Sequence, residues 1–192
     1  MLNKSNRSMF TESKIAQMGA FFIHKEGGVM PHLKLMKLLY LTDRRSMTEW
    51  GYPVSYDQMV SMPHGPVLSC TLSYINGDVK DSDYWDSWIS DKENHTVSLN
   101  TPLNNLNQLD QLSDIELSIM EKTWSKFGSM DKWEIRDYTH DHCKEWKDPN
   151  NSSYPIPYKD VFKAIGRNKK DSSRLQQEIE ATQNMDELFA SL

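Results

Sequence analysis

Cysteine is scarce in this sequence, since Cys70 and Cys143 are the only two among 192 residues. They lie far apart and outside any CxxC spacing, so neither a disulfide framework nor a cysteine-rich zinc site is indicated. A reducing cytoplasm is therefore the expected compartment. The first ten residues, MLNKSNRSMF, also lack the apolar core of a signal peptide.

Long apolar runs and the common catalytic motifs are missing as well. No stretch approaches the roughly 20 apolar residues that a membrane helix needs. The sequence contains no P-loop, Rossmann glycine pattern, nucleophile elbow or paired-histidine zinc helix, and this weakens an enzymatic interpretation. The formal net charge of -5 argues against general nucleic-acid binding, because contacts to phosphates require an excess of Lys and Arg.

What the sequence does contain is a series of helix patterns with their start and stop signals. The expected fold is mainly α (α+β), a single compact domain of about six to eight helices with a small antiparallel β element. Residues 96–99 are expected to form a strand, and residues 84–88 either a short helix or a strand. The expected β element is a small hairpin in this region, joined by a short strand over residues 58–62. The main helices are expected from a cap at Thr11 or Ser13 to His24, from Pro31 to Trp50, from about Pro66 to Ile75, from a capping box of Ser113 and Glu116 to Phe127, from a cap at Ser129 through Tyr138, and from a cap near Ser172 to Leu192.

The helix expected from Pro31 to Trp50 carries a stripe of basic residues. At about 100° per residue, four cations fall within one arc of about 100°, while apolar residues cover the opposite side. We expect the stripe to face water or a partner and the apolar side to face the core. The basic stripe consists of Lys34, Lys37, Arg44 and Arg45.

Asp43 breaks this pattern, because it falls in the middle of the apolar side. A buried carboxylate would cost several kcal/mol unless donors surround it. Asp43 is therefore expected to accept hydrogen bonds from backbone N–H groups or from a neighbouring Arg or His. A functional acid is the alternative, although nothing nearby in the sequence supplies a partner base.

The segment His64-Gly65-Pro66 predicts a tight turn from a strand into a helix, since proline suits a first helical position. The free N–H groups of that helix, with His64 beside them, form an alternative anion site. Later in the chain, His140, His142 and Cys143 offer nitrogen and sulfur ligands for a metal. Two histidines two residues apart on a helix point to different sides, so we expect no metal site there.

The two ends of the chain are set apart from the rest. Residues 1–10 are expected to form a flexible leader, residues 11–166 the helical domain, and residues 167–192 a basic linker followed by an amphipathic helix. The apolar face of that helix includes Leu175, Ile179 and Phe189. It is expected either to dock on its own core or to bind a partner or a second copy.

Residues 35–77, LMKLLYLTDRRSMTEWGYPVSYDQMVSMPHGPVLSCTLSYING, resemble the signature of the SocA-like Panacea domain. Members of that family show a KLLY-type helix, an Asp-Arg pair, a G-x-P turn and a GPV segment in this order. The LSDIE helix start at Leu112 and the H-x5-W segment from His140 to Trp146 resemble the second half of the family. The likeness covers roughly residues 12–165. The residues that the resemblance assigns to the structural motif are Asp43, Arg44, His64, Gly65, Pro66, His140 and Trp146.

The resemblance implies a non-enzymatic antitoxin without cofactor or metal. Panacea domains neutralise unrelated toxins, generally by forming a protein complex, so the implied partner is a cognate toxin encoded by an adjacent gene. The candidate contact surfaces are the basic stripe, the loop of residues 148–158 and the C-terminal helix. Three alternatives stay open: a proteolytic adaptor, like the founding member of the family; a hydrolase that uses Asp43, His64 and His140; and a regulator that binds its own operator.

Overall fold

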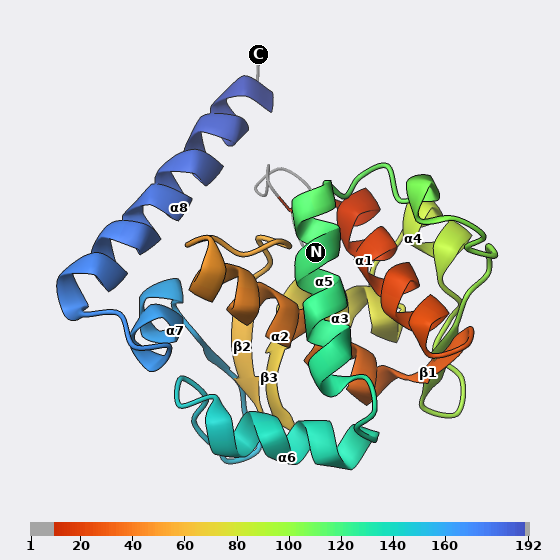
Figure 1. Cartoon of the computed structure of the whole chain (residues 1–192), viewed down its shortest axis with the longest axis horizontal. Coiled ribbons are helices and arrows are strands. Elements are labelled where there is room, and N and C mark those ends of the chain that lie inside the picture. Colours follow the sequence, from red (N-terminus) through yellow and green to blue (C-terminus); the bar gives the residue numbers. More distant parts are fainter. Residues whose placement is uncertain (1–9, 191–192) are drawn as a thin grey trace.

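The computed structural model describes the backbone of residues 10–190 and the side chains of residues 10–185. This part of the chain forms a mainly α domain with two small antiparallel sheets, as the sequence predicts (Figure 1). The predicted leader lies outside the described residues except for Phe10, which packs against the core. None of the described helices is long and apolar enough to cross a membrane.

The helices begin and end close to the predicted signals. Thr11 caps the first helix through its side chain, and Ser113 and Glu116 form the predicted capping box. Two predicted caps are wrong. The sixth helix is capped by Asp131, whose carboxylate accepts from two backbone N–H groups, and not by Ser129. The last helix begins at Lys169, so Ser172 lies inside it, and Asn168 accepts from the Asp171 N–H instead. The helices are α1 (Glu12–Lys25), α2 (His32–Glu49), α3 (Ser69–Asn76), α4 (Asp83–Trp88), a 3-10 turn η1 (Leu106–Gln108), α5 (Asp114–Phe127), α6 (Lys132–His142), α7 (Tyr158–Ala164) and α8 (Lys169–Ala190).

The strand pairing differs from the prediction. Residues 83–88 form a helix, and only the isolated bridges Ile89–Leu99 and Glu93–Thr96 remain of the predicted hairpin. Residues 96–98 pair with the short segment between α1 and α2, so that Met30 lies opposite Val97, and residues 59–62 belong to a separate sheet. The second sheet has the order β3-β2-β5, and Val60 lies opposite Val67 on one side and Pro155 on the other. The strands are β1 (Val29–Pro31), β2 (Met59–Met62), β3 (Gly65–Leu68), β4 (Thr96–Ser98) and β5 (Tyr154–Pro155).

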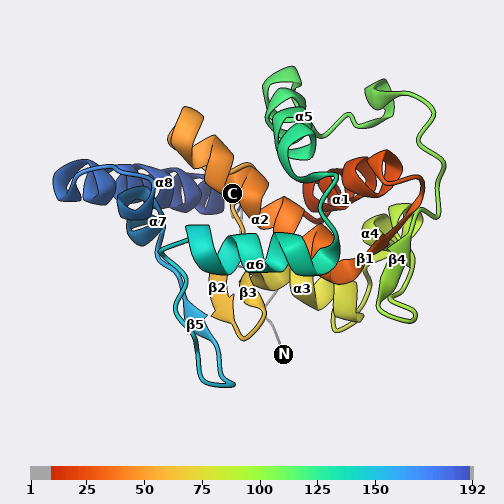
Figure 2. The ribbon, with the colours of Figure 1, turned by 60° about the horizontal axis from the view of Figure 1, so that its bottom comes forward.

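Helix α2 lies at the centre of the molecule, with α1, α5, α6, α7 and β3 packed around it (Figures 1 and 2). Every residue from Lys34 to Asp43 is buried. A helix that is enclosed on all sides has no face left for solvent. The charged side chains of Lys34, Lys37 and Asp43 therefore need partners inside the protein.

Candidate functional site

The carboxylate of Asp43 is fully buried and holds the loop that follows α2. Its Oδ1 accepts hydrogen bonds from the backbone N–H groups of Val54 and Ser55, both at 2.9 Å, and its Oδ2 accepts from the Ser55 hydroxyl. Burial raises the pKa of Asp43 to about 7, while the hydrogen bonds from Ser55 and Val54 act in the opposite direction. The predicted role as a structural acceptor is confirmed.

A second buried carboxylate, Asp57, has the same kind of role, and sequence reasoning missed it. Its oxygens accept from the backbone N–H groups of Cys70 and Thr71 at 2.9 and 2.8 Å, at the beginning of α3. They also accept from the Thr71 hydroxyl at 2.8 Å. The spacing of 13 residues between Asp57 and Cys70 gives no local signal, because the intervening hairpin is what brings them together.

The turn at His64 contradicts the predicted helix start. Gly65 and Pro66 belong to strand β3, and the next helix begins only at Ser69. His64 is exposed at the tip of the β2–β3 hairpin, away from any helix N-terminus. The alternative prediction of an anion site at His64 is therefore wrong, because residues 65–68, whose N–H groups would bind the anion, form a strand and not the first turn of a helix.

Lys37 is the cation that this hairpin covers. Its side chain is completely buried, and its Nζ donates a 2.8 Å hydrogen bond to the Pro66 carbonyl oxygen. Burial lowers the pKa of Lys37 to about 7. Gly65 makes this contact possible: its φ is 93°, and a Cβ there would lie 2.9 Å from the Lys37 Nζ and 2.8 Å from the Thr139 Oγ1.

Glu145 joins α2 to the segment after α6. Its side chain is buried, and its Oε1 accepts from the Tyr40 hydroxyl and from the Arg44 Nε, both at 2.7 Å. Arg44 also donates to the His142 carbonyl oxygen at 3.2 Å. Burial is the main cause that raises the pKa of Tyr40, so its hydroxyl stays a donor at neutral pH. We call Lys37, Tyr40, Asp43, Arg44 and Glu145 the central polar cluster.

His140 and Trp146 stack on each other beside this cluster, with ring centroids 4.2 Å apart and planes 5° apart. The Trp146 Nε1 donates to the Met62 carbonyl oxygen at 3.0 Å, which ties the segment after α6 to β2. Within the described part of the chain, the buried Nε2 of His140 has no hydrogen-bond partner. Burial, followed by the charge of Lys37, lowers the pKa of His140.

The basic stripe does not lie on one exposed face. Lys34 and Lys37 are buried, so the expectation that they face water is wrong for both. The Lys34 Nζ pairs with Glu26 at 2.6 Å and donates to the Gly128 carbonyl oxygen at 2.8 Å. The helical projection failed here because α2 is surrounded on all sides, a condition that its own sequence pattern does not reveal.

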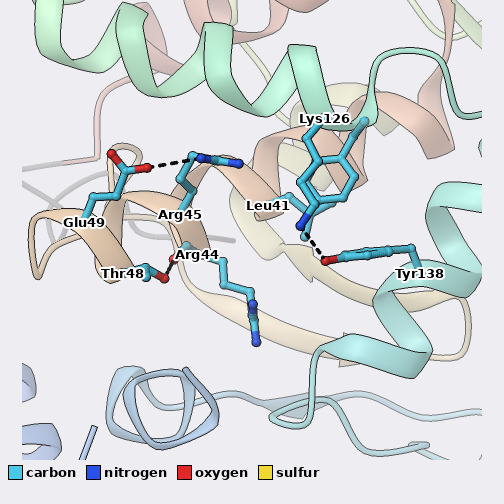
Figure 3. Close-up of a pocket in the computed structure, with 8 residues that line it drawn as sticks. Leu41, Arg44, Arg45, Thr48, Glu49, Lys126 and Tyr138 are labelled. Atoms are coloured by element: carbon cyan, nitrogen blue, oxygen red, sulfur yellow. Dashed lines mark hydrogen bonds and ion pairs between the residues drawn. The ribbon is translucent and has the colours of Figure 1, made fainter. Parts of the chain in front are cut away.

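Arg44 and Arg45 instead line a groove between α2, α5 and α6 (Figure 3). Its volume is about 220 Å³, and the other lining residues are Leu41, Thr48, Glu49, Lys126, Phe127 and Tyr138. Arg45 pairs with Glu49 at 3.2 Å. The Lys126 Nζ donates to the Tyr138 hydroxyl at 3.1 Å.

The proposed hydrolase residues do not share a reaction site. The oxygens of Asp43 are occupied by Val54 and Ser55, and the His64 side chain is exposed on the hairpin, whereas His140 stacks on Trp146. No hydrogen bond joins any two of these three side chains among the residues that the structure describes. Within the same residues, no group of three or more His, Cys, Asp or Glu side chains is placed to hold a metal ion.

The C-terminal helix lies against the body as far as Gln183, which lines a groove with Tyr56 and Tyr158. Ser172 and Ile179 are buried, and Leu175 lies against Gly51, where an added Cβ would be 3.3 Å from its Cδ2. Met185, farther along, is 55% exposed. The side chain of Phe189, the third apolar residue predicted for this face, lies outside the described residues.

The central polar cluster, the β2–β3 hairpin and the segment after α6 all lie in a part of the chain that matches a known protein family. The family model described as "Antitoxin SocA-like, Panacea domain" matches residues 35–147. The chain belongs to this family. No curated protein and no solved structure gives a match.

The Panacea domain match begins inside α2 and ends one residue after Trp146. All residues of the central polar cluster therefore lie inside it, and so do the hairpin and the His140–Trp146 stack. Helices α1, α7 and α8 lie outside it. The matched residues thus include the buried polar side chains that fix the loops around α2.

Proposed function

We propose that this Panacea domain protein is the antitoxin of a toxin–antitoxin pair, and that it neutralises a cognate toxin by direct binding and without catalysis in the cytoplasm. The observation that carries the proposal is the family match over residues 35–147. The separation of Asp43, His64 and His140 supports a binding protein over a hydrolase, because acid–base catalysis requires groups that reach one reacting centre. The toxin is expected to be the product of an adjacent gene.

We propose that the toxin binds at the end of α2, and not at Lys34 and Lys37 of the basic stripe, because these two lysines are buried. Trp50 and Tyr52 are 50% and 38% exposed at the end of α2. They flank Gly51, against which Leu175 of α8 is packed. Exposed Trp and Tyr side chains are the residues that most often dominate protein–protein binding energy. Because they take no part in the central polar cluster, the toxin can vary while the fold stays the same.

Co-expression with the product of the adjacent gene tests the proposal, with growth rescue and pull-down as the two measurements. Trp50→Ala is expected to weaken the complex by at least about 2 kcal/mol, the usual range for an aromatic hot spot. Trp133→Ala is the matched control, since Trp133 is 47% exposed on α6.

The outcomes separate the surface from the function. If Trp50→Ala and Trp133→Ala rescue growth equally, the proposed surface is wrong. If no adjacent product forms a complex with the wild-type chain, the antitoxin proposal itself fails. The amount of toxin in rescued cells distinguishes masking, in which the toxin persists, from delivery to a protease, in which it disappears.

A further inference from the structure

The groove between α2, α5 and α6 carries an excess of positive charge over an apolar floor. Arg44 is matched by Glu145, whereas Arg45 and Lys122 share the single carboxylate of Glu49. Lys126 has no carboxylate partner within the described residues and lies over the rings of Phe127 and Tyr138, at 5.0 and 5.2 Å.

Together with Lys122, which contacts Glu49 at its rim, the groove therefore has about two uncompensated cations in a protein whose formal net charge is -5. Its floor is formed by the buried side chains of Leu41 and Phe127. A volume of about 220 Å³ accommodates one large side chain and is too small for a folded domain. An acidic segment that carries an apolar anchor has the complementary chemistry.

The last turns of α8 have this chemistry. From Leu175 onward the chain contains Glu178, Glu180, Asp186 and Glu187 and no Lys, Arg or His. Met185 is 55% exposed in the same segment. An unbranched Met side chain adapts to irregular apolar pockets, which makes it a suitable anchor.

The last turns of α8, after Gln183, cannot reach the α2–α5–α6 groove of their own chain. Ser172 and Ile179 fix the first half of the helix to the body, and the helix continues without a break to Ala190. Its C-terminal end points away from α6, which forms one wall of the groove (Figure 1). Because a helix rises about 1.5 Å per residue, the last turns extend some 10 Å beyond Gln183.

We propose that two copies of this chain form a dimer in which the last turns of each α8, after Gln183, occupy the α2–α5–α6 groove of the other. Asp186 and Glu187 meet the excess charge of Lys126 in the groove and of Lys122 at its rim, and Met185 fills the apolar floor. The exchange is reciprocal, so each dimer contains the same helix-in-groove contact twice, as closed two-fold symmetry requires. The acidic helix and the basic groove are thus the two halves of one interface.

The mass of the full chain in solution, measured by light scattering over a range of concentrations, tests the proposal. The wild type is expected to reach twice its 22.4 kDa chain mass, with a dissociation constant on the order of 10 µM that rises with salt. Lys126→Glu in the groove and Met185→Glu in the helix should each weaken the dimer at least about 10-fold. Lys80→Glu and Gln177→Glu, at exposed positions outside the proposed interface, make the same changes in charge and should dimerise like the wild type.

Mixing the two defective variants gives the sharper result. The Lys126→Glu chain keeps an intact α8 and the Met185→Glu chain keeps an intact groove, so the mixture should form a heterodimer that neither variant matches alone. A wild type that stays monomeric at about 0.2 mM, or a mixture that does not recover, would overturn the exchange. If Lys126→Glu leaves the mass unchanged and abolishes growth rescue, the groove belongs to the toxin and the dimer is refuted. Toxin rescue by the monomeric variants leaves the antitoxin function untouched.

Discussion

The buried ammonium of Lys37 makes the stability of this protein depend on pH in a predictable way. Lys37 is completely buried beneath the β2–β3 hairpin, and its Nζ donates to a neutral group, the Pro66 carbonyl oxygen, at 2.8 Å. Burial without a carboxylate partner lowers its pKa to about 7. In the unfolded chain the same group has a pKa of about 10.4.

The sign of the effect follows from the number of protons bound in each state. Between pH 7 and pH 10, the unfolded chain keeps the proton on Lys37, whereas the folded protein loses it. Stability therefore rises with pH in this window, at up to about 1.4 kcal/mol per pH unit. Between pH 7 and pH 9 the contribution amounts to about 2 kcal/mol, because the folded group is half-titrated at the start.

Urea unfolding of the wild type and of Lys37→Met at pH 7, 8 and 9 measures this contribution. Methionine keeps the length of the side chain but cannot titrate, so the difference in unfolding free energy between the two proteins isolates Lys37 from the other groups. This difference should shift in favour of the wild type by about 2 kcal/mol from pH 7 to pH 9. Lys80→Met, at an exposed position, controls for the loss of one lysine. A difference that changes by less than about 0.5 kcal/mol over this range would refute the reasoning.

Three further predictions concern the hydrogen bonds and close contacts around α2. Asp43→Ala leaves two buried N–H groups and a hydroxyl without an acceptor, and should lower the unfolding free energy in urea by about 3 kcal/mol or more. Gly65→Ala should lower the unfolding free energy by at least about 1 kcal/mol more than Gly77→Ala. Both glycines have positive φ, but only Gly65 has atoms within 4 Å of the added methyl group. Equal melting temperatures of the two variants would contradict this prediction. Trp146→Phe keeps an aromatic ring against His140 but loses the N–H donated to Met62, so a cost of about 1 kcal/mol is expected in urea, and a neutral result would show that this bond contributes nothing.

Local signals predicted most of the helices, the caps at Thr11 and Ser113, and one buried acceptor. Thr11, Ser113 and Glu116 act within three residues of their targets, so the sequence alone contains the whole interaction. Asp43 was predicted because a carboxylate on an apolar face must find donors, although its partners at Val54 and Ser55 could not be placed in advance. The family resemblance was likewise visible in the order of residues 35–77, and the match over residues 35–147 confirms it.

Only the tertiary structure decided which charges are inside and which strands pair. A helical projection divides α2 into a basic and an apolar side, but α5, α6 and the β2–β3 hairpin cover both sides, so Lys34 and Lys37 are buried while Arg44 and Arg45 line a groove. The β1–β4 pairing joins segments more than 60 residues apart and depends on how α1 and α2 pack. The sequence by itself determined most of the helices and that Asp43 needs donors, because those requirements are local. The burial of Lys37 and the composition of the groove depend on contacts between distant segments, and these exist only once the chain has folded around α2.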